Sequence, residues 1–193
     1  MKNIAIFGGA RAGKTTLAKM IYKEFPNYHI ISGDDIRYAF QKVLPDNEIN
    51  SKGGKGMIDD FPNFLATYFY KAAKRNEGEI SYIVETCDIY PTKAKELFND
   101  ENTILLFLGT PLQSEAEHFQ EIRKYENEKD WTYDRDDAHI IEHCNYWIPA
   151  VRKIQEECQN LNLWFVDTSI NREQVLEDTL KKIKDLIIAD KEK

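Results

Sequence analysis

The chain has little cysteine and no long apolar run. Its three cysteines, Cys87, Cys144 and Cys158, lie far apart and form no C-x-x-C pair, so the sequence indicates neither a zinc site nor a disulfide framework. No apolar stretch approaches the ~18 residues of a membrane span, and no charged-then-apolar leader opens the chain. We therefore expect a cytoplasmic protein in a reduced compartment, with no membrane association.

Positive charge is also not in excess. The chain carries 33 acidic and 26 basic residues, a formal net charge of −7. A surface of this sign repels polyanions, which disfavours broad binding of nucleic acid but leaves room for a local basic cleft. At 193 residues and 42% hydrophobic content, the sequence suits a single domain, residues 1–193, around one good core.

Short apolar runs alternate with longer amphipathic stretches along most of the chain. This alternation predicts repeated βα units, and hence an α/β fold with a mainly parallel sheet and helices on both of its faces. The predicted strands are Asn3–Phe7, Tyr28–Ser32, Ile80–Val84, Thr103–Leu108 and Leu163–Val166. The predicted helices are Lys14–Phe25, Asp35–Val43, Phe61–Arg75, Pro91–Phe98, Leu112–Glu126, Asp137–Cys158 and Arg172–Ile188.

Two polar intervals interrupt this rhythm. Leu44–Asp60 holds a glycine cluster that cannot form a stable helix interior, since glycine costs about 1 kcal/mol per residue there. Tyr125–Asp137 is dominated by charged residues. Long polar insertions of this kind often act as binding loops or lids. The alternatives are a solvated surface loop in each case and, for the second interval, a continuous charged helix.

A phosphate-binding motif directly follows the first predicted strand. Residues 8–15 fit G-x-x-x-x-G-K-[ST] in full, and a predicted helix begins near Lys14. Backbone N–H groups of such a loop face one concavity, and the helix adds its positive dipole end there. We expect a nucleoside triphosphate, with Lys14 on its β- and γ-phosphates and Thr15 on Mg²⁺. The expected nucleotide-binding residues are Gly8, Gly9, Ala10, Arg11, Ala12, Gly13, Lys14, Thr15 and Thr16.

Two polar residues follow the second predicted strand, where ligands of an open α/β sheet bind. Asp34 and Arg37 are three residues apart and would share one face of a helical turn near the phosphate loop. Asp34 is suited to accept the proton of an attacking hydroxyl, while Arg37 orients Asp34 or holds the acceptor. The alternative is that Asp34 or Asp35 only caps the helix and Arg37 is solvated. Asp35 fits such a cap, or a partner in Mg²⁺ hydration.

Glu85 directly follows the third apolar run. An acidic residue at this strand end, beside the phosphate loop, lies where a Walker B carboxylate binds Mg²⁺. A solvated carboxylate at a strand end is the alternative. We expect Asp88, three residues on, to cap the helix that begins at Pro91.

A transferring phosphoryl group needs arginines to neutralise its charge. Arg123 and Arg135 flank the second polar interval and are our candidates, with Arg11 of the phosphate loop as a third. Because the same segment is rich in acids, these arginines can equally form ordinary surface ion pairs.

With these motifs, the chain resembles the P-loop kinase family of small-molecule phosphotransferases, which includes shikimate, gluconate and nucleoside monophosphate kinases. The resemblance rests on Gly8–Thr15, on Glu85 and on the Asp34-x-x-Arg37 pair, which looks like the catalytic Asp and Arg of phage polynucleotide kinase. It implies a three-layer P-loop NTPase fold whose five-stranded parallel sheet has the order 2-3-1-4-5. It further implies an acceptor-binding insertion at about 44–75 and an arginine-bearing lid at about 123–136.

Read together, the motifs predict an ATP- and Mg²⁺-dependent kinase that moves the γ-phosphoryl group to a hydroxyl of an unidentified small-molecule acceptor. The lid has no run of several arginines of the kind seen in nucleoside monophosphate kinases, which argues against that acceptor. The alternatives are a nucleotide-dependent regulatory ATPase and an ATP-binding module without an acceptor. A GTPase is disfavoured because the chain has neither an N-K-x-D nor a D-x-x-G motif. The sequence does not indicate an oligomeric state.

Overall fold

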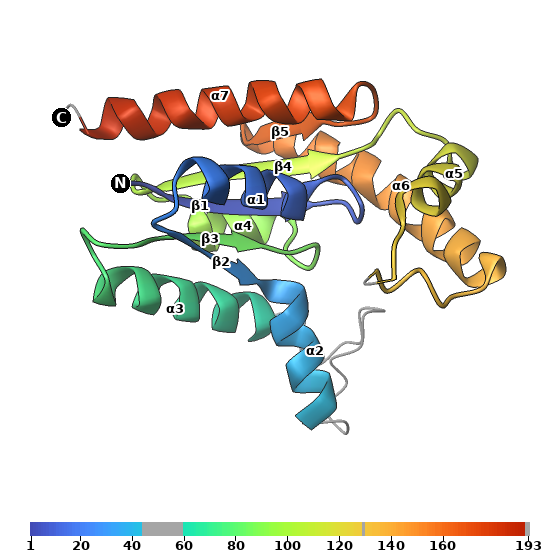
Figure 1. Cartoon of the computed structure of the whole chain (residues 1–193), viewed down its shortest axis with the longest axis horizontal. Coiled ribbons are helices and arrows are strands. Elements are labelled where there is room, and N and C mark those ends of the chain that lie inside the picture. The colour runs from blue at the N-terminus through green and yellow to red at the C-terminus, as the bar shows by residue number, and fades with distance from the viewer. Residues whose placement is uncertain (44–59, 129, 192–193) are drawn as a thin grey trace.

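The structure, a computed structural model, describes residues 1–43, 60–128 and 130–191 (Figure 1). Most of the first polar interval, and with it the first part of the predicted acceptor-binding insertion, lies outside the described residues. Within them, no helix has the length and apolar content needed to cross a membrane.

Five parallel strands form one sheet, in the order β2-β3-β1-β4-β5. This confirms the predicted sheet and its order. Every predicted strand is present to within a residue at each end, because runs that are apolar throughout suit strands covered on both faces. The strands are β1 (Asn3–Gly8), β2 (Tyr28–Ser32), β3 (Ser81–Glu85), β4 (Thr103–Gly109) and β5 (Trp164–Asp167).

Helices cover both faces of the sheet (Figure 1). Helices α1 and α7 pack together on one face, and α3, α4 and the second half of α6 pack on the other. The three layers agree with the predicted P-loop NTPase architecture. The helices are α1 (Lys14–Glu24), α2 (Gly33–Val43), α3 (Asp60–Arg75), α4 (Pro91–Phe98), α5 (Glu115–Tyr125), α6 (Asp137–Leu161) and α7 (Arg172–Lys191).

Alternate residues of the central strand β1 contribute to two separate hydrophobic cores, one on each face of the sheet. Ala5 and Phe7 point into the core beneath α3 and α4, and the Phe7 ring packs edge-on against Phe98 at 5.0 Å between centroids. Ile4 and Ile6 point into the core beneath α1 and α7. Since successive strand residues alternate faces, burial on both sides requires an unbroken apolar run. The apolar run ends at Phe7 and the strand ends at Gly8, the first residue of the phosphate loop.

Local capping explains where some helices depart from the predicted bounds. Helix α5 begins at Glu115 rather than Leu112, because Ser114 and Glu117 form a reciprocal capping box. Helix α6 runs on to Leu161 and ends at Asn162, which takes up the left-handed conformation. Between α5 and α6 the chain forms turns, so the second polar interval is a loop and not a continuous helix. From here on, "the lid" denotes residues 126–136.

Candidate active site

The phosphate loop connects β1 to α1 and depends on glycine at two points. Gly8 has φ +115°, and a Cβ there would lie 2.1 Å from the Leu108 carbonyl oxygen. Gly13 has φ +97° and occupies the N-cap of α1, where no side chain caps the first turn. Residues with a side chain rarely adopt either conformation. The loop therefore keeps a tight turn and leaves the first N–H groups of α1 available to an anion.

Lys14 lies across this loop. Its side chain is buried, and Nζ donates a hydrogen bond of 2.7 Å to the Gly9 carbonyl oxygen. The ammonium group is therefore held within the loop, and its contact with a triphosphate stays a prediction.

Thr15 and Glu85 meet at the ends of α1 and β3. The Thr15 hydroxyl donates a hydrogen bond of 3.1 Å to Glu85 Oε1, and Glu85 is buried. Burial raises the pKa of the Glu85 carboxyl, while the positive charge of Lys14 acts in the opposite direction. A hydroxyl and a carboxylate oxygen side by side next to a phosphate loop fit Mg²⁺, which prefers oxygen ligands. Glu85 is therefore buried against Thr15 and not merely solvated, and the binding of Mg²⁺ by this pair stays a prediction.

Asp34 is held by the segment that follows β3. Its Oδ1 accepts a hydrogen bond of 2.9 Å from the Thr86 hydroxyl, and Cys87 Sγ lies 3.8 Å from the same oxygen. Asp34 does not cap α2. The hydroxyl of Ser32 does so, accepting from the Asp35 backbone N–H at 3.2 Å, which corrects the capping alternative. Asp34 thus projects into the site with one oxygen fixed.

Arg37 pairs with a residue that the sequence analysis assigned wrongly. Its Nε lies 3.0 Å from Asp88 Oδ2, and its Nη2 lies 3.8 Å from Asp34 Oδ1. Asp88 was expected to cap α4, but the residue before that helix is Tyr90, which makes no side-chain cap. Burial raises the pKa of Asp88, and Arg37 partly counters this effect. Asp88 therefore belongs to the site, although nothing in its local sequence separates this role from capping.

These groups open into one cleft with a volume of about 1540 Å³. Its walls come from the phosphate loop, α1, α2, the end of β3, α5, the lid and the first half of α6. Several predicted site residues reach it, and Gly8, Gly9 and Ala12 lie buried behind the loop surface. The predicted residues that line the cleft are Ala10, Arg11, Gly13, Lys14, Thr15, Thr16, Asp34, Arg37, Glu85 and Arg135.

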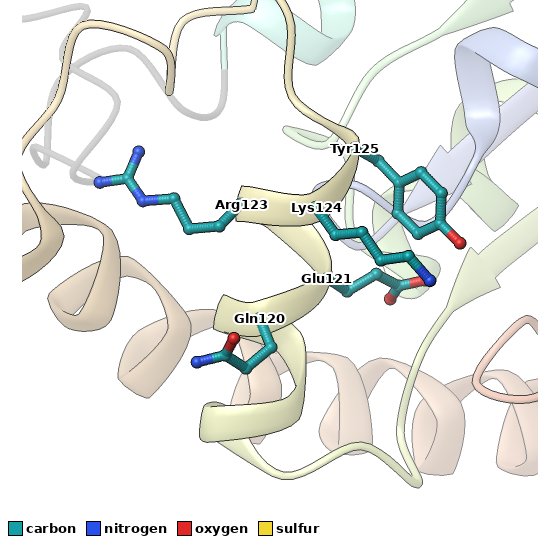
Figure 2. A pocket seen from close by; sticks show the side chains of 5 residues that line it. All are labelled: Gln120, Glu121, Arg123, Lys124 and Tyr125. Atoms are coloured by element: carbon teal, nitrogen blue, oxygen red, sulfur yellow. The ribbon is translucent and has the colours of Figure 1, made fainter.

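Arg123 does not line this cleft. Its guanidinium binds Glu126 and Asp137 and donates to the Arg135 carbonyl oxygen at 2.8 Å. Figure 2 shows its side chain extending away from Lys124 and Tyr125, which share a small surface pocket with it. Arg123 thus braces the lid, and its position gives no support to the catalytic role expected for it.

Two further arginines at the cleft form ion pairs. Arg11, with the positive φ of 59°, lies 2.9 Å from Asp130 of the lid. Arg172, at the start of α7, lies 2.5 Å from Glu121 of α5 and was not identified from the sequence. Its only sequence signal is its position at the start of the helix predicted after the fifth strand.

No protein-family model matches the chain, and no curated protein matches it in sequence. Solved structures do match it in shape. A shikimate kinase from Bacteroides thetaiotaomicron superposes with a TM-score of 0.56 at 12% identity, covering 97% of this chain and 99% of its own. The chain has the fold of the P-loop small-molecule kinases. A gluconokinase from Sinorhizobium meliloti 1021 gives 0.56 at 12% identity, covering 96% and 93%. A shikimate kinase from Acinetobacter baumannii, solved with shikimate, gives 0.52 at 17% identity, covering 100% and 96%.

Proposed function

We propose that the protein is a cytoplasmic, ATP- and Mg²⁺-dependent kinase that phosphorylates a hydroxyl group of a small molecule. One observation carries the proposal. Lys14, Thr15 and Glu85, which suit a triphosphate and its Mg²⁺, line the same cleft as the candidate base Asp34 and its ion-pair partner Arg37. A nucleotide-binding module without an acceptor does not need this second group. The kinase fold of the superposed structures is consistent with this function.

In the proposed reaction, Asp34 accepts the proton of the attacking hydroxyl. The acceptor oxygen forms a bond to the γ-phosphorus, the bond from that phosphorus to the bridging oxygen breaks, and its electron pair leaves with ADP. Lys14 and Arg135 stabilise the charge on the phosphoryl group. Mg²⁺, when bound by Thr15 and Glu85, neutralises charge on the phosphates.

Arg37 acts on Asp34 and not on the nucleotide. It forms ion pairs with both Asp34 and Asp88, so its positive charge offsets the repulsion between these two carboxylates. Thr86 holds the same Asp34 oxygen from the other side. The second Asp34 oxygen is thereby directed to a proton in the cleft.

Acceptor-dependent release of ADP tests the proposal. Purified protein with Mg²⁺·ATP is screened against hydroxyl compounds, and the wild type is compared with Asp34→Asn and with Asp185→Asn, an exposed control on α7. We expect at least one acceptor to stimulate ADP release, and Asp34→Asn to reduce that rate by about 100-fold or more without weakening ATP binding. Acceptor-independent hydrolysis that survives in Asp34→Asn would instead identify a regulatory ATPase.

A further inference from the structure

One face of α6 is turned toward the cleft rather than toward the core. His139, Glu142, His143, Tyr146 and Trp147 follow one another at helical spacing, and all line the cleft. The rings of Tyr146 and Trp147 meet edge-on at 5.5 Å between centroids. This arrangement gives an aromatic wall to the cleft that α2 and Asp34 also line.

Exposed aromatic rings gather at this cleft. Tyr38, Tyr125, Trp131 and Tyr146 each leave between 49% and 66% of their surface exposed, and all four line it. Large rings that face solvent around one cleft mark a surface that a ligand covers. Tyr146 also interacts with Tyr90, five residues after Glu85, which links the wall to the segment that follows β3.

Some charged side chains at the cleft are paired with opposite charges, and others are not. Of the described cations that line the cleft, Lys14 and Arg135 are assigned to the phosphoryl group under the proposed function, and Lys19 of α1 is exposed to solvent. Glu142 forms neither an ion pair nor a hydrogen bond with any described residue. The arginines that remain are held by carboxylates: Arg11 by Asp130, Arg37 by Asp34 and Asp88, and Arg172 by Glu121.

We propose that the acceptor is a hydroxylated organic cation, an alcohol or sugar that bears an ammonium group. This inference rests on the proposed kinase function and names the acceptor of that same site. The ammonium group lies against the Tyr146 and Trp147 rings, because the faces of aromatic rings attract cations. Glu142 supplies the counter-charge. The hydroxyl group reaches Asp34 across the cleft.

Ligands of similar size and different charge test this proposal by binding. D-Glucosamine, D-glucose and D-gluconate form one series, and choline with its neutral isostere 3,3-dimethyl-1-butanol forms another. Affinities are measured by calorimetry on the full chain with Mg²⁺ and a non-hydrolysable ATP analogue. Quenching of tryptophan fluorescence reports the same event, since two of the three tryptophans, Trp131 and Trp147, line the cleft.

In at least one series, we expect the cation to bind about tenfold or more tightly than its neutral partner, and gluconate to bind weakest in its own. Glu142→Gln is expected to remove that preference and leave the neutral ligand unchanged. Glu156→Gln, an exposed change later on α6, is the control and is expected to behave like wild type. Tyr146→Ala is expected to weaken the cation more than the neutral ligand.

The outcomes separate the two proposals. A cation preference that depends on Glu142 supports this inference even if no ligand is phosphorylated, which would overturn only the kinase function. Phosphorylation that favours the neutral or anionic ligands overturns the inference and leaves the kinase function standing. Equal binding of cation and neutral partner in both series also overturns it.

Discussion

Arg11 of the phosphate loop and Asp130 of the lid form an ion pair at 2.9 Å, so two parts of the chain 119 residues apart are joined across the cleft. Both side chains are only about one-fifth exposed, 21% and 23%. The guanidinium belongs to the loop that is expected to hold the triphosphate. A phosphate group and the Asp130 carboxylate therefore compete for Arg11.

This competition predicts the effect of removing the carboxylate. Asp130→Asn frees Arg11 and takes a negative charge away from the triphosphate, so we expect ATP to bind several-fold more tightly, with a smaller gain at high salt. Calorimetric titration with Mg²⁺·ATP measures the change, and Asp134→Asn, an exposed lid residue, is the control. Weaker binding in Asp130→Asn would show instead that the ion pair assembles the nucleotide site.

The buried carboxyl of Glu85 predicts a pH dependence of stability. Burial raises its pKa above the ordinary value of 4.5, so in the metal-free protein its ionised form disfavours the folded state. This cost is absent at pH values below the ordinary pKa and develops as pH rises through the raised one. Glu85→Gln is therefore expected to raise the melting temperature at pH 8 without Mg²⁺, with little gain at pH 4.

Magnesium should reverse that difference. Because the ionised carboxylate is the metal ligand, Mg²⁺ with ATP is expected to stabilise the wild type at pH 8 and to do so far less in Glu85→Gln. Thermal melts with and without Mg²⁺ at both pH values give the comparison. Equal stabilisation of both proteins by Mg²⁺ would show that Glu85 does not take part in metal binding.

The fold could be predicted almost completely because its signals are local. An apolar run such as Ile4–Phe7 specifies a strand covered on both faces, and Gly8–Thr15 specifies the turn that follows. Helix ends were less predictable. The start of α5 depends on a reciprocal bond between Ser114 and Glu117, whereas the sequence pattern predicted a start three residues earlier, at Leu112.

The candidate site was predictable where residues stand at the ends of strands. Asp34 and Glu85 are placed by the sheet itself, so their neighbourhood follows from the strand order. Asp88, Arg172 and the aromatic face of α6 were missed because their roles depend on which elements pack across the cleft. Arg123 is the opposite case, because the sequence analysis expected a catalytic role that its position does not support. Its acidic neighbours along the chain, Glu126 and Asp137, form ion pairs with it in the structure.

The hydrogen bond from Thr86 to Asp34 predicts a positioning role for a residue that does not reach the cleft. Thr86 is fully buried, donates to Asp34 at 2.9 Å and accepts from the Asp88 backbone N–H at 3.2 Å. Thr86→Val keeps the shape and removes both bonds, so we expect kcat with an identified acceptor to fall about tenfold or more while KM for ATP stays unchanged. Thr86→Ser is expected to restore the rate. An equal loss in both variants would indicate a packing defect.

Arg123 of α5 and Arg135 of the lid give the last prediction, because the two side chains have different surroundings in the structure. Arg135 lines the cleft, so Arg135→Gln is expected to lower kcat by about 100-fold while the lid keeps its fold. Arg123 binds Glu126, Asp137 and two lid carbonyl groups, so Arg123→Gln is expected to loosen the lid. Limited proteolysis should then cut the lid faster in Arg123→Gln than in Arg135→Gln, at equal global stability. If Arg123→Gln instead lowers kcat by about 100-fold without faster cleavage, its guanidinium must leave these partners and act on the phosphoryl group itself.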